Sequence, residues 1–297
     1  MIVMTLNVRG LASKPKKLAI YRLIADQSVD VLFFQETMGD GGLFVGNMEL
    51  LLPGWTLCSV DAKGKSGGFL VGWKNWFLFF LNSWAMASGL SVALYSTELK
   101  MEICFINIYG PYAEREGFWN NLLEFISANC TKFILGGDLN FSLGLSEIWG
   151  VRARSDGLLD FFSKILDDHG LVDIAPNVIL PTWTNRRVGS DNICKRFDRL
   201  MISGDLLDHE LCFFQWVGCG GDSDHHPIFL QVLGNDKKLH TPFKFNPYWL
   251  GNEDLVNLMK NTWKVYDENF VLPPTAQFQA NLKQIKSVSI CWFVKRK

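Results

Sequence analysis

The chain alternates short apolar runs with stretches in which apolar residues recur at every third or fourth position. Short apolar runs are typical of buried strands, and the spaced pattern is typical of helices. Most of the runs follow one another at close intervals, which predicts antiparallel or mixed sheets. The predicted strands lie at residues 2–8, 30–37, 55–60, 67–73, 76–81, 90–96, 102–110, 132–140, 171–174, 181–185, 195–203, 210–217 and 227–233.

Within residues 1–233, apolar residues at helical spacing occur in only a few stretches. This spacing predicts helices at residues 14–27 and 114–128 and a third helix within residues 155–170. For the third helix, Ser155 is the expected N-cap and Gly170 the expected stop. Many strands with few helices predict an α/β fold, namely a four-layer α/β/β/α sandwich of two packed mixed β-sheets flanked by helices.

The composition of the chain changes near residue 234. The stretch "GNDKKLHTPFKFNPYW" is polar and contains Pro and Gly, and a helix capped by Asn252 and a basic amphipathic tail follow it. We therefore predict a first domain in residues 1–233. Residues 234–297 are predicted to form a linker and a helical appendage without catalytic function.

Composition and charge exclude several classes of protein. An apolar content of 48% with 20% charged residues indicates a globular chain, and the net charge of −1 argues against a protein that coats nucleic acid. The seven cysteines form no C-x-x-C pair, which indicates free thiols in a reducing compartment and no structural zinc. The N-terminus does not resemble a signal peptide, and no apolar run reaches the ~18 residues of a membrane span. We expect an intracellular protein without a membrane partner.

Polar side chains gather where the predicted strands end. Ligands bind at a rim on which strand ends converge. Carboxylates together with Asn, Tyr and His side chains in one cleft suit a hard cation and a phosphate ester. The residues at these strand ends are Asn7, Glu36, Tyr109, Asp138, Asn140, Asp198, Asp224 and His225.

Each motif has a plainer interpretation when it is taken alone. Glu36 could be a solvated turn residue, "GDLN" an ordinary turn, and Asp198 the partner of an arginine. "SDHH" could be a loop or a transition-metal site, although zinc would need a further His or Cys at ligand spacing. "GKSGG" (64–68) resembles a phosphate loop, but that motif requires Gly where the chain has Ser59, so we predict a tight turn.

Taken in order, the motifs resemble the endonuclease/exonuclease/phosphatase superfamily of DNase-like, metal-dependent phosphodiesterases. The matching motifs are "LNVRGL" (6–11), "QET" (35–37), "NIYGPY" (107–112), "GGDLN" (136–140), "RFDRL" (196–200) and "SDHHPI" (223–228). Within this superfamily, "SGGFLVGW", "WTN", "HGLVDI" and "PFKFNPYWL" are most similar to the endonuclease domain of plant LINE-type non-LTR retrotransposon polyproteins. A reverse transcriptase follows in that group, so we expect a truncated or stand-alone derivative.

The resemblance implies a metal site and a water-activating group. Glu36 matches the principal Mg²⁺ ligand, with Asn7 beside it and Asp224 completing the acidic cluster near the metal. Mn²⁺ is the expected substitute for Mg²⁺. Asp138 matches the residue that orients or deprotonates the attacking water, and Asn140 matches the residue that holds Asp138 and the phosphate.

The resemblance also implies groups that contact the substrate. His225 is expected on the scissile phosphate, with Asp198 as its buried carboxylate partner, and Tyr109 is expected to donate a hydrogen bond to a phosphate oxygen. His226 is interpreted as structural and Asp222 as a solvated turn residue. The expected substrate-binding residues are Arg9, Thr182 and Asn185.

Several basic residues lie in loops beside the motif strands, where they could contact the DNA backbone. For any single one of them ordinary surface charge is the favoured interpretation, except for Arg9, which adjoins Asn7 at the cleft. They are Arg9, Arg152, Arg154, Arg186, Arg187, Lys195, Arg196 and Arg199.

The resemblance implies a Mg²⁺-dependent endonuclease that nicks one DNA strand and leaves 3′-hydroxyl and 5′-phosphate ends. We expect it to act as a monomer, in the nucleus. Two alternatives stay open, because fold and metal site are shared across the superfamily. One is an abasic-site repair endonuclease or a phosphodiesterase acting on another phosphate ester. The other is a catalytically silent remnant that binds nucleic acid.

Overall fold

The computed structural model describes residues 1–11, 13–38, 48, 50–62, 67–176, 178–221, 223–234, 247–263 and 274–294. Residues 64–66 of the predicted turn at 64–68, and Asp222, lie outside the described residues. The chain divides into two compact units, residues 1–237 and 238–297, and each is described by itself. Among the described residues, no helix has the length and apolar character needed to cross a membrane.

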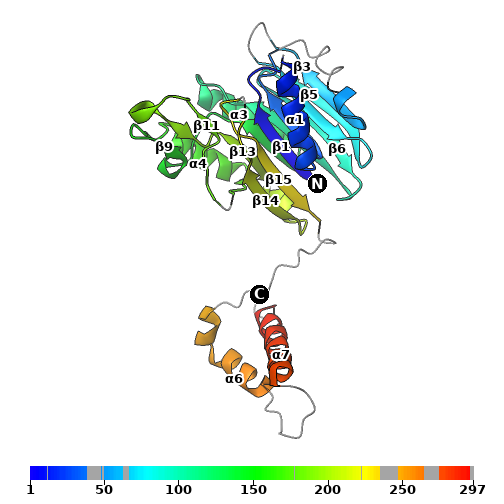
Figure 1. The fold of residues 1–297 in the computed structure, drawn as a ribbon, viewed down its shortest axis with the longest axis vertical. Coiled ribbons are helices and arrows are strands. Elements are labelled where there is room, and N and C mark those ends of the chain that lie inside the picture. Colours follow the sequence, from blue (N-terminus) through cyan, green and yellow to red (C-terminus); the bar gives the residue numbers. More distant parts are fainter. Residues whose placement is uncertain are drawn as a thin grey trace. The chain divides into compact units, whose positions relative to one another are not determined.

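The described part of the first unit contains two six-stranded sheets (Figure 1). The first sheet has the order β14 (Cys212–Val217), β15 (Ile228–Leu233), β1 (Ile2–Asn7), β2 (Val31–Gln35), β4 (Phe69–Lys74) and β3 (Trp55–Val60). The second has the order β10 (Leu171–Asp173), β13 (Asp198–Ser203), β8 (Phe133–Asp138), β7 (Met101–Tyr109), β6 (Gly89–Ser96) and β5 (Leu78–Met86). A small third sheet has the order β11 (Trp183–Thr184), β12 (Cys194–Lys195) and β9 (Ile148–Trp149).

Three hydrophobic clusters hold the layers together. The first lies between the two large sheets and includes Val3 and Phe33 of one sheet and Phe105 of the other. The second joins the second sheet to α3 (Arg115–Asn129) and α4 (Leu159–Asp168), and the third joins the first sheet to α1 (Lys14–Asp26). The predicted four-layer α/β/β/α sandwich is therefore confirmed. Shorter helical segments are η1 (Leu145–Glu147), η2 (Gly189–Asp191) and α5 (Gly204–Leu207).

The start of α4 differs from the prediction. Ser155 is not its N-cap, since the helix begins only at Leu159. The Asp156 carboxylate accepts a hydrogen bond from the backbone N–H of Leu158 and pairs with Arg115 at 2.7 Å. This ion pair to another helix holds the preceding residues outside the helix. The expected stop is confirmed, because Gly170 directly follows the C-cap in the left-handed region, at φ +60°.

The second unit contains helices in its described residues. They are η3 (Pro247–Gly251), α6 (Glu253–Thr262) and α7 (Pro274–Val294). Asn252 caps α6 as predicted, because its side chain accepts a hydrogen bond from the backbone N–H of Leu255. Leu255 is fully buried, and the ring of Trp263 packs against Phe278 of α7 at 5.9 Å.

Candidate active site

The strand registers bring most of the predicted residues to one end of the two sheets. β1 and β2 are parallel, and so are β7 and β8, so each pair ends at the same edge. In the second sheet, Asp138 lies directly beside Tyr109 of β7 and beside Asp198 of β13. Asn7 ends β1, and Glu36 follows the last residue of β2. Residues paired across neighbouring strands point to the same face of a sheet, so these side chains meet at a common rim where the strands end.

The buried part of this rim is a carboxylate–histidine–carboxylate cluster. His225 Nδ1 lies 2.9 Å from Asp198 Oδ2, and Nε2 lies 3.5 Å from Asp138 Oδ2. All three side chains are almost completely buried. Burial alone lowers the pKa of His225, but the two carboxylates more than offset it and raise the pKa to about 9. His225 is therefore protonated at neutral pH.

The pKa of the Asp138 carboxyl group is also shifted from its usual value. Burial raises the pKa of the carboxyl to about 7, although His225 and a hydrogen bond from Asn7 favour the ionised form. A carboxyl group that titrates near neutrality suits general-base work.

Asn7 links the two sheets across the site. Its Nδ2 donates to Glu36 Oε1 at 2.9 Å and to Asp138 Oδ2 at 3.0 Å. Glu36 is held in the left-handed region at φ +52°, with its side chain nearly buried. No described residue donates a hydrogen bond to Glu36 Oε2, whose nearest cation is Arg9 Nη1 at 3.9 Å.

This donor set fits a hard divalent cation. Glu36 Oε2 is a carboxylate oxygen of the kind that Mg²⁺ prefers. Asn7 directs its amide nitrogen at Glu36, and its amide oxygen accepts the backbone N–H of Arg9, so Asn7 would bind an ion beside Glu36 only with its amide group turned over. Asp138, Asp198 and His225 form a second group whose ligand atoms lie within 4.8 Å of one another and could also hold an ion. A protonated His225 opposes that use, because both of its ring nitrogens then carry protons.

Asn140 and Tyr109 complete the rim. Asn140 lies at φ +54°, donates to the carbonyl of Gly110 at 2.7 Å, and has a buried Oδ1 without a partner. Its backbone N–H donates to Asp138 Oδ1 at 3.3 Å, and its role in orienting Asp138 stays a prediction. Burial and the nearby Glu36 raise the pKa of Tyr109 well above its usual range, so its hydroxyl stays a hydrogen-bond donor.

Gly137 sets the position of Asp138 and carries a testable prediction. It lies at φ +142°, and a Cβ there would overlap the carbonyl oxygen of Ile108 on the neighbouring strand. Gly137→Ala is expected to lower the free energy of unfolding by about 2 kcal/mol or more, measured by urea denaturation. Gly157→Ala is the control, because its Cβ would meet no atom within 4 Å. Equal stability of the two variants would contradict this account.

Arg9 and Asp224 are brought together, but not in the way the sequence predicts. Arg9 Nε and Nη2 each donate to the Asp224 carboxylate at 2.9 Å. Trp183 Nε1 donates to the same carboxylate at 3.1 Å. Burial alone raises the pKa of Asp224, but the hydrogen bonds and charge of Arg9 and the charge of His225 more than offset it and lower that pKa. Asp224 thus forms a bidentate ion pair with Arg9, and its role as a metal ligand stays a prediction.

Thr182 and Asn185 use their side chains within the protein. The fully buried Thr182 hydroxyl accepts the backbone N–H groups of Phe197 and Asp198, both at 3.0 Å. Asn185 donates to the carbonyl of Asp191 at 2.8 Å and accepts two backbone N–H groups of the same loop. Both residues order segments beside the site, and their contact with substrate stays a prediction.

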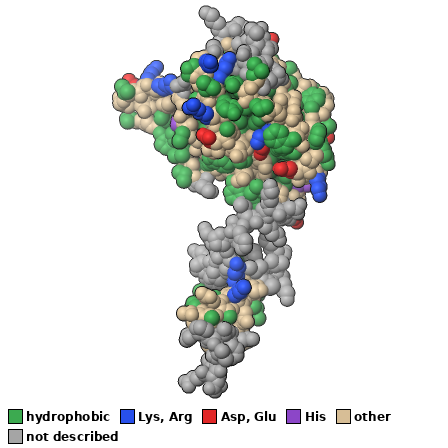
Figure 2. Space-filling view, turned by 45° about the vertical axis from the view of Figure 1, so that its right-hand side comes forward, with side chains coloured by type: hydrophobic (Ala, Val, Ile, Leu, Met, Phe, Trp, Pro, Cys, Tyr) green, Lys and Arg blue, Asp and Glu red, His purple; other side chains and the backbone are tan. Residues whose placement is uncertain are grey.

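Two basic residues expected at the rim are buried elsewhere, which corrects the prediction for them. Arg196 and Arg199 are 1% and 0% exposed. Both pair with Glu147 and Asp173 instead of facing solvent. Arg186 and Arg187 are exposed on the loop after β11. On the face shown in Figure 2, Lys and Arg side chains lie in separate groups and do not form one continuous basic surface.

Sequence reasoning missed a polar link inside the sandwich. Gln35 Nε2 donates to Asn107 Oδ1 at 2.5 Å, and Asn107 Nδ2 donates to the carbonyl of Phe34 on the facing sheet. Ser223 was missed as well, although its hydroxyl donates to the carbonyl of Asn7 at 2.6 Å and accepts from the backbone N–H of His225. The sequence signal that could have identified Gln35, Asn107 and Ser223 is that each is a polar residue inside or beside an apolar motif strand.

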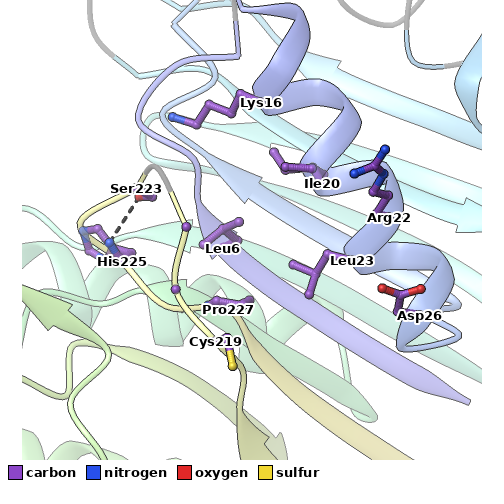
Figure 3. A pocket seen from close by; sticks show the side chains of 13 residues that line it. Leu6, Lys16, Ile20, Arg22, Leu23, Asp26, Cys219, Ser223, His225 and Pro227 are labelled. Carbon is purple, nitrogen blue, oxygen red and sulfur yellow. Dashed lines mark hydrogen bonds between the residues drawn. The ribbon is translucent and has the colours of Figure 1, made fainter.

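A cavity of about 360 Å³ lies between α1 and the segment that leads to His225 (Figure 3). Leu6, Ile20, Leu23 and Pro227 give it a largely apolar lining, and His225 lines it as well as the rim. The other polar side chains that line it are Lys16, Arg22, Asp26 and Ser223. The polar groups that can act on a phosphate ester belong to the rim formed by Glu36, Asp138 and His225.

Comparison with protein families shows which family has this combination of fold and motifs. Residues 4–225 match the family described as the Endonuclease/Exonuclease/phosphatase family. No curated protein matches the chain.

Solved structures with the same fold include enzymes that process DNA. The endonuclease domain of TRAS1, a telomere-specific non-LTR retrotransposon, matches with a TM-score of 0.60 at 18% identity, covering 78% of this chain and 97% of that one. The 3′ phosphatase NExo from Neisseria, bound to product DNA hairpin, matches with a TM-score of 0.62 at 18% identity, covering 78% and 98%. The AP endonuclease LMAP from Leishmania major matches with a TM-score of 0.62 at 18% identity, covering 77% and 86%. At this identity, the likeness shows the fold alone.

Proposed function

Because the chain belongs to the endonuclease/exonuclease/phosphatase family, we propose that it is a divalent-metal-dependent endonuclease that nicks one strand of DNA. The products are a 3′-hydroxyl and a 5′-phosphate. The observation that supports this most directly is the continuous set of contacts from Asp198 through His225 and Asp138 to Asn7 and Glu36. It combines a protonated donor, a base and an oxygen-rich ion site within one rim.

Glu36 and Asn7 would hold Mg²⁺, with Mn²⁺ as a substitute. When bound, the ion neutralises charge on the scissile phosphate and on the leaving 3′ oxygen. Asp138 takes the proton of the attacking water, and its elevated pKa lets it do so near neutral pH. Asn140 fixes the Asp138 carboxylate through its backbone N–H.

The protonated His225 donates a hydrogen bond to a phosphate oxygen as negative charge develops there. Asp198 holds the imidazole through Nδ1, which directs Nε2 toward the reacting centre. Tyr109 donates a further hydrogen bond to the phosphate. Both side chains contribute charge or hydrogen bonds that are fixed before the substrate arrives.

DNA is the substrate that the features around the site favour. The motif set resembles plant LINE-type endonucleases, and exposed Arg186 and Arg187 stand on a loop that begins at β11 beside the site. We assign the reaction to the first unit, acting as a monomer in the nucleus. The described residues of the second unit contain none of the rim side chains. An abasic-site endonuclease, a phosphodiesterase for another ester and a silent binding remnant are the alternatives.

Relaxation of supercoiled plasmid by the purified full chain tests the proposal. Nicking with Mg²⁺ that stops in EDTA, with nicks that DNA ligase can seal, is the expected result. Glu36→Gln is expected to slow nicking about a hundredfold or more. Glu124→Gln, at an exposed position of α3, is expected to keep full activity. Nicking that persists in EDTA, or equal activity of the two variants, would overturn the assignment.

A further inference from the structure

The Arg9 guanidinium is held between two carboxylates of the rim. Two of its nitrogens bind both oxygens of Asp224 at 2.9 Å, and Nη1 lies 3.9 Å from Glu36 Oε2. The backbone of Arg9 is also fixed, at φ +46°, with its N–H donating to Asn7 Oδ1 at 3.2 Å. The side chain is 44% exposed, so one side of the guanidinium stays open to a ligand.

Asp224 has little capacity left for a metal ion. One of its oxygens accepts Arg9 Nε, and the other accepts Arg9 Nη2 and Trp183 Nε1. An ion bound to this carboxylate would lie next to a guanidinium that cannot lose its proton. Coulomb repulsion would weaken an ion site at Asp224 more than one at Glu36, because the guanidinium lies 2.9 Å from the Asp224 oxygens and 3.9 Å from Glu36 Oε2.

We propose that the Arg9 guanidinium takes the place of a second metal ion, so that the rim binds a single divalent ion at Glu36 and Asn7. Asp224 is then a positioning residue for Arg9, steadied by Trp183, and not a metal ligand. Arg9 presents Nη1 to a phosphate oxygen as a fixed positive charge. This inference rests on the proposed function, because it takes Glu36 as the ligand of the one ion.

Counting bound Mn²⁺ by electron paramagnetic resonance tests this without DNA and without activity. The full chain, stripped with EDTA and dialysed, is expected to bind one ion. Arg9→Met is expected to bind two ions, because Asp224 becomes available. The double variant Arg9→Met/Asp224→Asn is expected to return to one. Arg9→Lys keeps the positive charge and is expected to bind one, and so is Arg22→Met, which removes an exposed arginine of α1.

Two bound ions in the wild-type chain, or a single ion in a folded Arg9→Met variant, would overturn the inference while leaving the endonuclease proposal intact. A wild-type chain that binds none, or a Glu36→Gln variant that still binds one with wild-type affinity, would instead remove the proposed function itself. Thermal melting of each variant establishes that the counted protein is folded.

Discussion

A His225→Ala variant is expected to nick supercoiled plasmid about a thousandfold more slowly than the wild-type chain. His225 is 2% exposed and has a carboxylate at each ring nitrogen, which raises its pKa to about 9. The imidazolium therefore supplies a fixed positive charge at neutral pH. Because this charge acts where the phosphate becomes more negative, its removal should lower kcat more than it raises KM.

Two further variants separate this chemical role from folding. His225→Ala leaves Asp138 and Asp198 buried without their cation, which lowers stability as well. His225→Gln keeps a hydrogen-bonding side chain of similar size without the charge, and the same loss of kcat is expected at a smaller cost in stability. His226→Ala is the matched control. Its ring contacts the carbonyl of Gly218, so activity within about threefold of wild type is expected. A His225→Gln variant as active as His226→Ala would contradict the assigned role.

The rim could be predicted from the sequence because strand ends carry its residues. A polar residue that ends an apolar run marks where a strand leaves the sheet. The parallel pairs β1–β2 and β7–β8 then bring such ends to one edge. Asn7, Glu36 and Asp138 were found in this way, and the structure places them within hydrogen-bond distance of one another through Asn7.

What could not be predicted depends on pairing between distant segments. Nothing in the sequence near Arg9 indicates that its partner lies 215 positions away at Asp224. Likewise, the start of α4 depends on Arg115, which draws Asp156 out of the helix. Local propensity favours Ser155 as a cap, but a long-range ion pair decides the outcome.

The burial of charged side chains also could not be predicted from the sequence. Arg196 and Arg199 flank the motif residue Asp198 and were expected to face DNA. Arg199 in β13 and Arg196, which precedes this strand, instead point into the protein, toward Glu147 and Asp173. A basic residue beside a catalytic strand therefore indicates a phosphate contact only when it is also exposed.

Replacing Arg199 by Met is expected to lower the free energy of unfolding by about 3 to 5 kcal/mol. Arg199 is 0% exposed, and its two carboxylate partners are also shared by Arg196. Without Arg199, the buried carboxylate of Glu147 and the partly buried carboxylate of Asp173 would face one remaining guanidinium, which leaves an uncompensated negative charge. Urea denaturation at neutral pH measures the effect. Arg152→Met is the control, since its ion pair with Asp191 is largely exposed and should contribute less than about 1 kcal/mol.

The dependence of this loss on pH gives a sharper test of its cause. Burial alone raises the pKa values of Glu147 and Asp173, but the arginines more than offset it and lower both. Groups with a lowered folded pKa stabilise the protein above their unfolded pKa of about 4, and this contribution disappears as the pH falls through the folded value. The difference in stability between wild type and Arg199→Met should therefore be full at pH 7 and shrink below about pH 4. A difference that stays constant between pH 7 and pH 3 would assign the loss to packing, because packing does not require ionised carboxylates.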